Sequence, residues 1–456
     1  MPDPTSMHRY SDETERVAQA ALAYARDRLR LHPVPLDGPR TQAELEAAVG
    51  ETITPLGLGG EAALRLFADV LARATVSVDN PRYLAFIPAA PTESATLFDL
   101  VVAASSIYGG SWLEAAGATY AENQALRWVA DLAGLPEGAG GCFVQGGTVG
   151  NLSALVAARH AFLARRGGRP EGRLQVAATD EVHSSIVTAA RVMDVDVIGV
   201  ATDEGGRMTA AALEAALAEG AEDGLFAAVA TAGTTNLGVI DDLAGIAQVC
   251  ERRGIWFHVD AAYGGAALAA PSVRARFGGI ERCDSFIVDP HKWLFAPYDC
   301  CALLYRRPEL ALAAHAQHAG YLEPLQGGTE WNASDYAVHL SRRSRGLPFW
   351  FSLAAHGTDA YRDAIEHTLT VARGARAEIE ARPYLELVND PDLTVLCIRR
   401  PGWGPDDYRD WSARLLADGT AFITPTTVAG EVVTRIAIVN PRTTRADIAA
   451  ILDTMA

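Results

Sequence analysis

Short apolar runs alternate with segments of helical periodicity across residues 80–345, and this alternation is the strongest constraint on the fold. Each run has the length of a strand, and helical patterns such as Ala210–Leu217 and Leu243–Arg252 lie between the runs. The pattern predicts an α/β fold in which a mostly parallel sheet is joined by crossover helices. Ligands of such sheets bind at the carboxyl ends of strands, so the residues directly after each run are the first candidates for a site. The predicted strands are Leu174–Ala178, Val195–Val200, Phe226–Thr231, Trp256–Val259 and Ser285–Val288.

Residues 1–80 differ from this body and have the pattern of a helical arm. Apolar residues recur there at helical spacing on both sides of a Gly-rich break at Leu56–Gly60. A stripe of this kind cannot bury itself alone, so we expect the arm to pack on the body or on a second subunit. The two stripes are Val17, Ala21, Ala25 and Leu29, followed by Leu64, Phe67 and Leu71.

The texture changes again at Arg345–Gly346. A long helical stretch follows, then strand-like runs at Leu393–Arg399 and Val432–Val439 and a last helix from Arg445. We therefore predict a large domain over residues 81–345 and a small α+β domain over residues 346–456.

Charge argues against two classes of partner. The chain has 456 residues with 39 basic and 56 acidic side chains, a formal net charge of −17. Proteins that bind duplexes or anionic membrane surfaces usually carry the opposite sign, so we expect neither nucleic acid nor a membrane as partner. No apolar stretch is long enough to span a bilayer, and the first residues lack the apolar core of a signal peptide. These features favour a cytoplasmic protein.

The six cysteines form no recognisable framework. They are scattered, no CxxC pair occurs, and Cys300 and Cys301 are neighbours in the chain. We predict small buried side chains here, with neither disulfides nor a metal site.

Lysine usage points to one position. Lys292 is the only lysine of the chain, and the other 38 basic residues are arginine. Arginine stays protonated in proteins, whereas a lysine amine can lose its proton and attack carbon. The one remaining lysine is therefore expected where a guanidinium cannot do the chemistry.

Four reactive groups follow successive predicted strands: His183, Thr234–Thr235, Asp260 and Lys292. Each alone has an ordinary structural explanation: a hydrogen-bonded histidine, a turn, a helix N-cap or a buried lysine. Together at one sheet edge they predict a site. The apolar segment FIVDPHKWLFAP around Lys292 is expected to lower the pKa of its amine, because burial disfavours the charged form.

These groups meet the demands of pyridoxal phosphate. Its aldehyde needs an amine, its pyridine nitrogen a carboxylate, and its phosphate a set of donors. The donors are predicted at Gly146–Gly147–Thr148, a glycine turn between a strand and a helix that begins near Asn151. The segment GGTVG lacks the full spacing of a dinucleotide fingerprint.

The segments QGGTVGN, VHSSI, TAGTTNLGVIDD, HVDAAYGG, DSFIVDPHKWL and IAIVNPRTT resemble the group II pyridoxal-phosphate-dependent decarboxylases. This family includes the aromatic amino acid, histidine and glutamate decarboxylases, and the resemblance extends from about Asn80 to Asn440. It implies a fold-type I enzyme with a seven-stranded sheet that converts an L-amino acid to its amine and CO2. Lys292 would form the Schiff base, Asp260 would pair with the pyridine nitrogen, and His183 would stack on the ring. The other cofactor contacts it implies are Gly147, Thr148, Val149, Thr235, Ala262, Asp289 and His291.

The resemblance also implies a proton donor on a loop. In this family a tyrosine after the lysine commonly protonates the substrate carbon, and the matching residue is Tyr321, within the segment 318–333. Relatives with phenylalanine there let oxygen capture the intermediate and release an aldehyde, so Tyr321 favours simple decarboxylation.

Substrate choice rests on two segments that match pocket-lining stretches of the family. In RYLAFIPAAPT, Phe86 stands where many relatives have tyrosine, and Pro88 follows it. In YGGSW, Gly110 stands where a bulky aromatic is usual, and Tyr108 could refill the space. We expect an apolar pocket for an aromatic or other bulky apolar L-amino acid. Since family sites are built across a two-fold interface, the resemblance further implies a homodimer with its site at the interface.

Three alternatives remain open. Pyridoxal phosphate could support decarboxylation coupled to oxidative deamination, or amino-group transfer. A nucleotide-binding oxidoreductase would require a fuller glycine fingerprint than GGTVG. A regulator that binds the cofactor without turnover would not need Lys292, Asp260, His183 and Tyr321 together.

Overall fold

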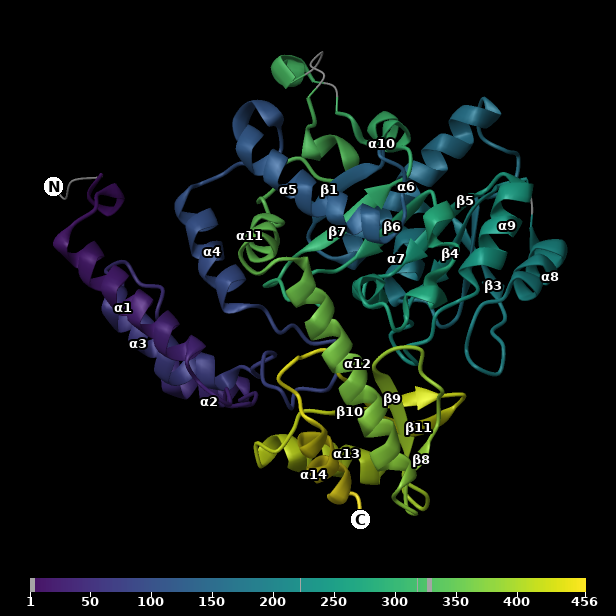
Figure 1. The fold of residues 1–456 in the computed structure, drawn as a ribbon. Coiled ribbons are helices and arrows are strands. Elements are labelled where there is room, and N and C mark those ends of the chain that lie inside the picture. The colour runs from purple at the N-terminus through teal and green to yellow at the C-terminus, as the bar shows by residue number, and fades with distance from the viewer. Residues whose placement is uncertain (1–4, 222, 318, 326–329) are drawn as a thin grey trace.

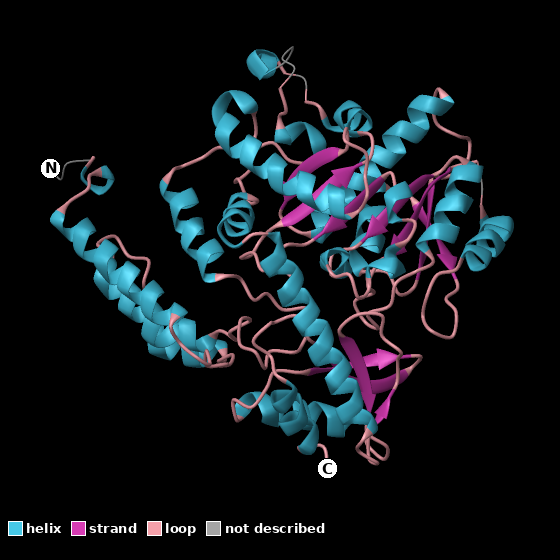
Figure 2. Ribbon diagram, viewed as in Figure 1, coloured by secondary structure: helices cyan, strands magenta, loops and turns pink. Residues whose placement is uncertain are grey.

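A computed structural model describes residues 5–221, 223–317, 319–325 and 330–456. Its centre is a seven-stranded sheet of order β1-β7-β6-β5-β4-β2-β3, in which only β7 runs against its neighbours (Figures 1 and 2). The predicted α/β fold with a mostly parallel sheet is confirmed. The strands are β1 (Gly140–Val144), β2 (Gln175–Thr179), β3 (Asp196–Val200), β4 (Leu225–Thr231), β5 (Trp256–Asp260), β6 (Ser285–Val288) and β7 (Cys301–Tyr305).

Helices cover both faces of this sheet. On one face α5, α8 and α9 pack on alternate strand residues such as Ala228 and Ala230 of β4. On the other face α6, α7 and α10 pack on the residues between them, such as Ala227 and Val229. Burial on both faces explains why the strands are continuous apolar runs. These helices are α5 (Trp112–Leu132), α6 (Gly147–Arg166), α7 (Ser184–Met193), α8 (Ala210–Gly220), α9 (Leu243–Arg253) and α10 (Pro308–His315).

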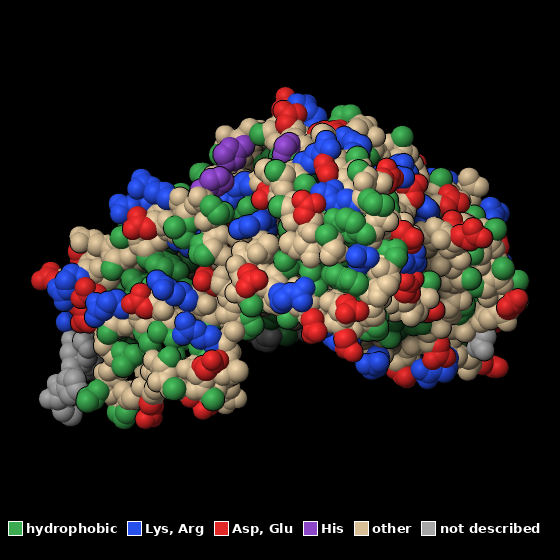
Figure 3. Space-filling view, turned by 90° about the horizontal axis from the view of Figure 1, so that it is seen from below, with side chains coloured by type: hydrophobic (Ala, Val, Ile, Leu, Met, Phe, Trp, Pro, Cys, Tyr) green, Lys and Arg blue, Asp and Glu red, His purple; other side chains and the backbone are tan. Residues whose placement is uncertain are grey.

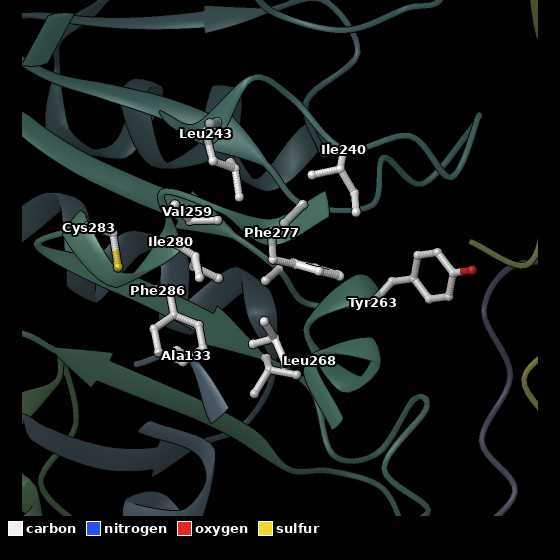
Figure 4. Packing of buried hydrophobic residues seen from close by; sticks show 14 of the residues in the cluster. Ala133, Ile240, Leu243, Val259, Tyr263, Leu268, Phe277, Ile280, Cys283 and Phe286 are labelled. Atoms are coloured by element: carbon white, nitrogen blue, oxygen red, sulfur yellow. The ribbon is translucent and has the colours of Figure 1, made fainter. Parts of the chain in front are cut away.

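The core on the first face continues beneath the sheet. Figure 4 shows Phe277, Phe286 and Leu268 converging from two short helices and a strand, with Val259 of β5 above them. All six cysteines are buried and free, as the sequence predicted.

Residues 5–80 form a helical arm at one side of the body (Figure 1). It contains α1 (Asp12–Leu29), α2 (Gln42–Val49) and α3 (Gly60–Leu66), and α3 continues as a short π-helical segment from Phe67 to Leu71. None of these helices contains a buried residue. Seen from below, the molecule is hollowed between this arm and the rest (Figure 3). Among the described residues, no helix is both long and apolar enough to cross a membrane.

A second, four-stranded antiparallel sheet of order β10-β11-β9-β8 lies near the C-terminus. Helix α12 joins the two parts: Tyr361 and Ile365 belong to the large core, whereas Ala375 and Ile379 belong to the core of the small sheet. The domain limits predicted at residues 80 and 345 stay a prediction. The remaining elements are α4 (Glu93–Ala104), α11 (Leu347–His356), α12 (Thr358–Glu380), α13 (Pro405–Ala417), α14 (Arg445–Asp453), β8 (Glu386–Leu387), β9 (Val395–Arg399), β10 (Thr424–Val428) and β11 (Glu431–Ala437).

Candidate active site

A cavity of about 260 Å³ lies where β1, β2, β4, β5 and β6 end. This is the edge at which ligands of open α/β sheets bind. It brings together nine of the residues predicted to contact a cofactor, from the ends of five strands and the segments that follow them. They are Gly147, Thr148, His183, Thr235, Asp260, Ala262, Asp289, His291 and Lys292.

Asp260 is the last residue of β5 and is 4% exposed. Its Oδ1 accepts a hydrogen bond from the backbone N–H of Ala262 at 3.1 Å, and its Oδ2 accepts one from Asn151 Nδ2 at 2.8 Å. These two hydrogen bonds fix the orientation of the carboxylate in the cavity wall.

His183 lies above the start of α7. Its side chain is the N-cap of that helix, with Nδ1 accepting from the Ser185 backbone N–H at 3.2 Å and lying 2.8 Å from Ser185 Oγ. His183 therefore has a structural role as a helix cap. The same hydrogen bonds fix the orientation of its ring, which lines the cavity.

Lys292 follows β6 and lies in an ionic cluster. Its Nζ is 2.9 Å from Asp289 Oδ2, and His291 Nε2 is 3.7 Å from the same oxygen. Burial lowers the pKa of the Lys292 amine, but the carboxylates of Asp289 and Asp260 outweigh burial, and the net pKa is raised. The expectation of a lowered pKa is therefore wrong: the apolar sequence around Lys292 hides two acidic partners that the fold brings to it.

The glycine turn leads directly into α6. The helix begins at Gly147 and not near Asn151, so Thr148 lies in its first turn. A Cβ on Gly147 would meet Ile287 at 3.2 Å and Asp289 Oδ2 at 3.3 Å, so a glycine lets the helix start pack closely against the end of β6. The first N–H groups of a helix have no partner within the helix, and Gly147 and Thr148 line the cavity. Val149 does not line the cavity: its N–H bonds to the Gly146 carbonyl, and its side chain packs on the apolar core.

Several lining residues were not predicted from the sequence. Asn151 reaches Asp260 from the second turn of α6, and Tyr298 and Gln145 close the walls. Burial raises the pKa of Tyr298, and its ring lies 4.8 Å from that of His291. The spacing of Asn151, one helical turn after the glycine turn, could have predicted that its side chain faces the site. Nothing in the sequence around Tyr298 indicates that its side chain lines the cavity.

Arg435 of β11 was also missed. It is 5% exposed, and its guanidinium donates to the carbonyl oxygens of Phe86 and Thr235. Its Nε has no hydrogen-bond partner, and in the described part of the chain no carboxylate lies within ion-pair distance. Arg435 is therefore a buried cation with no counter-ion among the described residues, and its bond to the Thr235 carbonyl places it next to a residue of the cavity wall.

The predicted substrate-pocket residues lie outside this cavity in the single chain. Phe86 is 58% exposed with a φ of 51°, and its ring lies 6.1 Å from that of Phe422, whereas Pro88 is buried. The Tyr108 ring covers Gly110, where any Cβ would approach it to 2.6 Å. The ring therefore fills the space that glycine leaves, as the sequence allowed.

Tyr321 belongs to a short helix, Gly320–Leu325, but its side chain lies outside the described part of the structure. Residues 318 and 326–329 of the proposed loop lie entirely outside the described part of the structure.

Comparison with known proteins decides the family. The profile described as "Pyridoxal-dependent decarboxylase conserved domain" matches residues 62–400. The chain belongs to this family. A pyridoxal-dependent decarboxylase of this kind uses pyridoxal phosphate to remove CO2 from an amino acid, as the sequence predicted.

Relatives agree in sequence and in fold. The aromatic-L-amino-acid decarboxylase of Bacillus atrophaeus is 30% identical over 389 residues, covering 82% of this chain and 80% of the relative. The L-2,4-diaminobutyrate decarboxylase of Rhizobium meliloti is 31% identical over 417 residues, covering 88% and 83%. The crystal structure of Oryza sativa TDC with PLP and tryptamine superposes with a TM-score of 0.90 at 25% identity, covering 100% of this chain and 99% of that one.

The cavity of this decarboxylase fits the cofactor. It offers an amine, a carboxylate and a helix N-terminus, the groups that the aldehyde, the pyridine nitrogen and the phosphate require. Three polar atoms of its residues, Gln145 Oε1, Thr231 Oγ1 and Asp289 Oδ1, are buried without a hydrogen-bond partner. Orphaned polar atoms are typical of a site whose ligand completes the hydrogen bonding.

Proposed function

We propose that this decarboxylase acts on an aromatic L-amino acid, releases the amine and CO2, and holds its cofactor through Lys292. The observation that carries the proposal is the placement of the chain's only side-chain amine in a cavity that Asp260, His183 and the start of α6 also line. Pyridoxal phosphate, when bound, supplies an aldehyde that condenses with amines and a ring that accepts the electron pair left when CO2 departs.

The residues of the cavity would divide the work of holding the cofactor. Asp260, oriented by two hydrogen bonds, would pair with the pyridine nitrogen. The N–H groups at the start of α6, together with Thr148, would bind the phosphate. His183 would cover one face of the ring, and His291 would lie beside Lys292.

The substrate carboxylate has a proposed partner in Arg435. The buried guanidinium is oriented by two carbonyl oxygens, and one of these belongs to Thr235 in the cavity wall. An anion that enters next to it would be favoured because the charge of Arg435 is otherwise uncompensated. Tyr321 is proposed to deliver the proton to the α-carbon after CO2 has left.

An aromatic cluster beside Tyr298 of the cavity wall supports an aromatic substrate. Tyr83 and Phe422 meet edge to face with their centroids 4.9 Å apart, and the ring of Phe86 lies 6.1 Å from that of Phe422. Burial, with a smaller contribution from Tyr298, raises the pKa of Tyr83 to about 12. Aromatic rings prefer such offset and edge-to-face neighbours. The proposal is also consistent with relatives named tryptophan decarboxylase and tyrosine decarboxylase.

We further propose a homodimer that works in the cytoplasm. Large apolar side chains are exposed along the arm, α4 and α5, and burial against a second copy would remove them from water. Six cysteines that are all free suit a reducing compartment. The exposed apolar residues of this region include Leu22, Ile53, Leu56, Phe67, Leu97, Leu100, Val101, Leu113 and Tyr120.

Product analysis tests the proposal. Purified protein is loaded with pyridoxal phosphate and incubated in air with each of the twenty L-amino acids and with L-2,4-diaminobutyrate, and products are identified by mass spectrometry. Formation of an amine from an aromatic acid is expected, and Lys292→Ala should abolish it. An amine formed only from diaminobutyrate or an acidic amino acid would contradict the substrate class. An aldehyde with ammonia would contradict the role of Tyr321.

A further inference from the structure

A buried chain of hydrogen bonds runs from the core of the sheet to Asp260. Trp256 Nε1 donates to Ser285 Oγ, which lies 2.8 Å from His258 Nδ1. His258 Nε2 is 2.8 Å from Asn151 Oδ1, and Asn151 Nδ2 donates to Asp260 Oδ2 at 2.8 Å. Each of these five side chains is 6% exposed or less.

The alternation of β5 explains how the chain is assembled. Trp256, His258 and Asp260 are every second residue of the strand, so all three point to the same face of the sheet. Helix α6 packs across that face and brings Asn151 against them. On the neighbouring strand, Ser285 stands directly beside His258 in the register.

Only one direction of donation satisfies this chain. The Trp256 indole can only donate, and an ionised Asp260 can only accept. Ser285 therefore donates to His258 Nδ1, His258 donates from Nε2 to Asn151, and Asn151 presents its N–H to Asp260. Burial lowers the pKa of His258 to about 4, so its imidazole is neutral with the one proton that this arrangement needs.

The same amide serves a second group. The nitrogen of Asn151 also donates to Ser185 Oγ at 2.9 Å. Ser185 Oγ lies 2.8 Å from His183 Nδ1, which already accepts the Ser185 backbone N–H. Because Nδ1 acts as an acceptor, the Ser185 hydroxyl donates to it, and the ring proton of His183 lies on Nε2.

We propose that Asn151 and His258 are positioning residues that hold one N–H donor on the Asp260 carboxylate and keep His183 in its Nε2–H tautomer. The proposal rests on the proposed function, in which Asp260 pairs with the pyridine nitrogen of the cofactor. A donor on the carboxylate keeps the shared proton on the nitrogen, because protonating Asp260 would cost it the hydrogen bond. The electron-accepting strength of the ring would then depend on two residues that do not touch it.

Other titratable groups near Asp260 do not provide this fixed donor. Lys292 is paired with Asp289, and His291 Nδ1 lies 2.7 Å from the Cys300 carbonyl oxygen. The groups that share the cavity with Asp260, besides Lys292, are His183, Asp289, His291, Tyr263, Tyr298 and Asp299.

The test replaces His258 and observes the cofactor nitrogen directly. Protein is loaded with pyridoxal phosphate labelled with nitrogen-15 in its ring, and the nitrogen chemical shift is measured at one fixed pH by solid-state NMR. In His258→Leu the shift should move from the protonated towards the neutral position, because Asn151 is no longer held with its N–H towards Asp260. The proton distribution between nitrogen and carboxylate should change about tenfold, the effect of losing one hydrogen bond to a charged group.

Three variants separate positioning from a general structural effect. His258→Gln keeps a donor for Asn151 and should restore the chemical shift. His315→Leu removes another buried histidine that also contacts α6, through the Ser153 carbonyl at 3.0 Å, and should leave the shift unchanged. Should His258→Leu not fold, Ser285→Ala removes the preceding member of the chain and should move the shift in the same direction.

The outcomes are distinct. In steady-state kinetics, His258→Leu should lower kcat with little change in KM, since the substrate contacts remain. An unchanged nitrogen shift in both His258→Leu and Ser285→Ala would overturn the inference, as would an equal movement in His315→Leu. If borohydride reduction of the unaltered protein attaches no cofactor to Lys292, the proposed function itself fails, and the inference with it.

Discussion

The buried ion pair between Glu122 and Arg342 should be the most sensitive electrostatic contact of the large domain. Its two N···O distances are 2.8 and 3.0 Å, and the two side chains are 3% and 0% exposed. Glu122 also accepts the N–H of Gly346, while Arg342 donates to the carbonyl oxygens of Gly109 and Phe143. One pair therefore ties α5, β1, the segment around Gly110 and the start of α11 together.

Removing one partner leaves the other charge buried and uncompensated. Glu122→Ala should lower the free energy of unfolding by about 3–5 kcal/mol, a large part of the 5–15 kcal/mol typical of a folded protein. The matched control is Glu431→Ala, which breaks a pair with Arg399 of the same geometry, at 2.6 Å, on the surface. Water screens that pair, so its loss should lower the free energy of unfolding far less than Glu122→Ala does.

Urea unfolding followed by circular dichroism measures both variants under one condition. A third variant, Glu122→Leu with Arg342→Met, removes both charges and should recover much of the loss, because an apolar pair needs no desolvation of ions. The reasoning is refuted if Glu122→Ala costs no more than Glu431→Ala, or if the double variant is less stable than Glu122→Ala alone.

Three further predictions concern the site. Lys292→Arg keeps the charge but not a deprotonatable amine, so activity and the borohydride-trapped cofactor should both be lost; turnover by this variant would contradict the assignment. Asp289→Asn removes the carboxylate that raises the pKa of Lys292, so the neutral amine should be present at lower pH and the pH profile of cofactor loading into apoprotein should move to lower pH; a move to higher pH would be evidence against the ion pair. Gly110→Ala places a Cβ 2.6 Å from the Tyr108 ring and should cost about 1–3 kcal/mol in thermal or urea unfolding unless Tyr108 is also reduced to Ala.

The sequence contained most of the sheet and of the cofactor-contact set because both depend on local patterns. The inner strands such as β4 and β6 are buried along their whole length, so each apolar run marks the position of its strand, whereas the edge strand β3 is mostly exposed. The residues after parallel strands reach the same edge of the sheet. The helix after the glycine turn begins earlier than predicted, because Gly147 and Thr148 already have helical backbone.

Features that depend on contacts between residues distant in sequence could not be predicted from local patterns. The pKa of Lys292 is set by how Asp289 and Asp260 face it, which the apolar residues around it in sequence do not indicate. Arg435 lies on a strand more than a hundred residues after Lys292. It directly precedes the segment IAIVNPRTT, but the segment does not indicate that the side chain reaches Thr235. His258 looked like an ordinary strand residue, although its two-residue spacing from Asp260 placed both on one face of β5.

The absence of lysine everywhere but at position 292 has a practical consequence for chemistry done on the protein. Reagents that acylate or reductively alkylate side-chain amines find a single target, and that target lies in the cavity beside Asp289. Side-chain coupling to an amine-reactive resin or dye would therefore inactivate the enzyme, and only coupling through the α-amine of the chain would leave Lys292 unmodified. Conversely, the fraction of Lys292 that resists such a reagent gives a direct count of the sites that already hold cofactor.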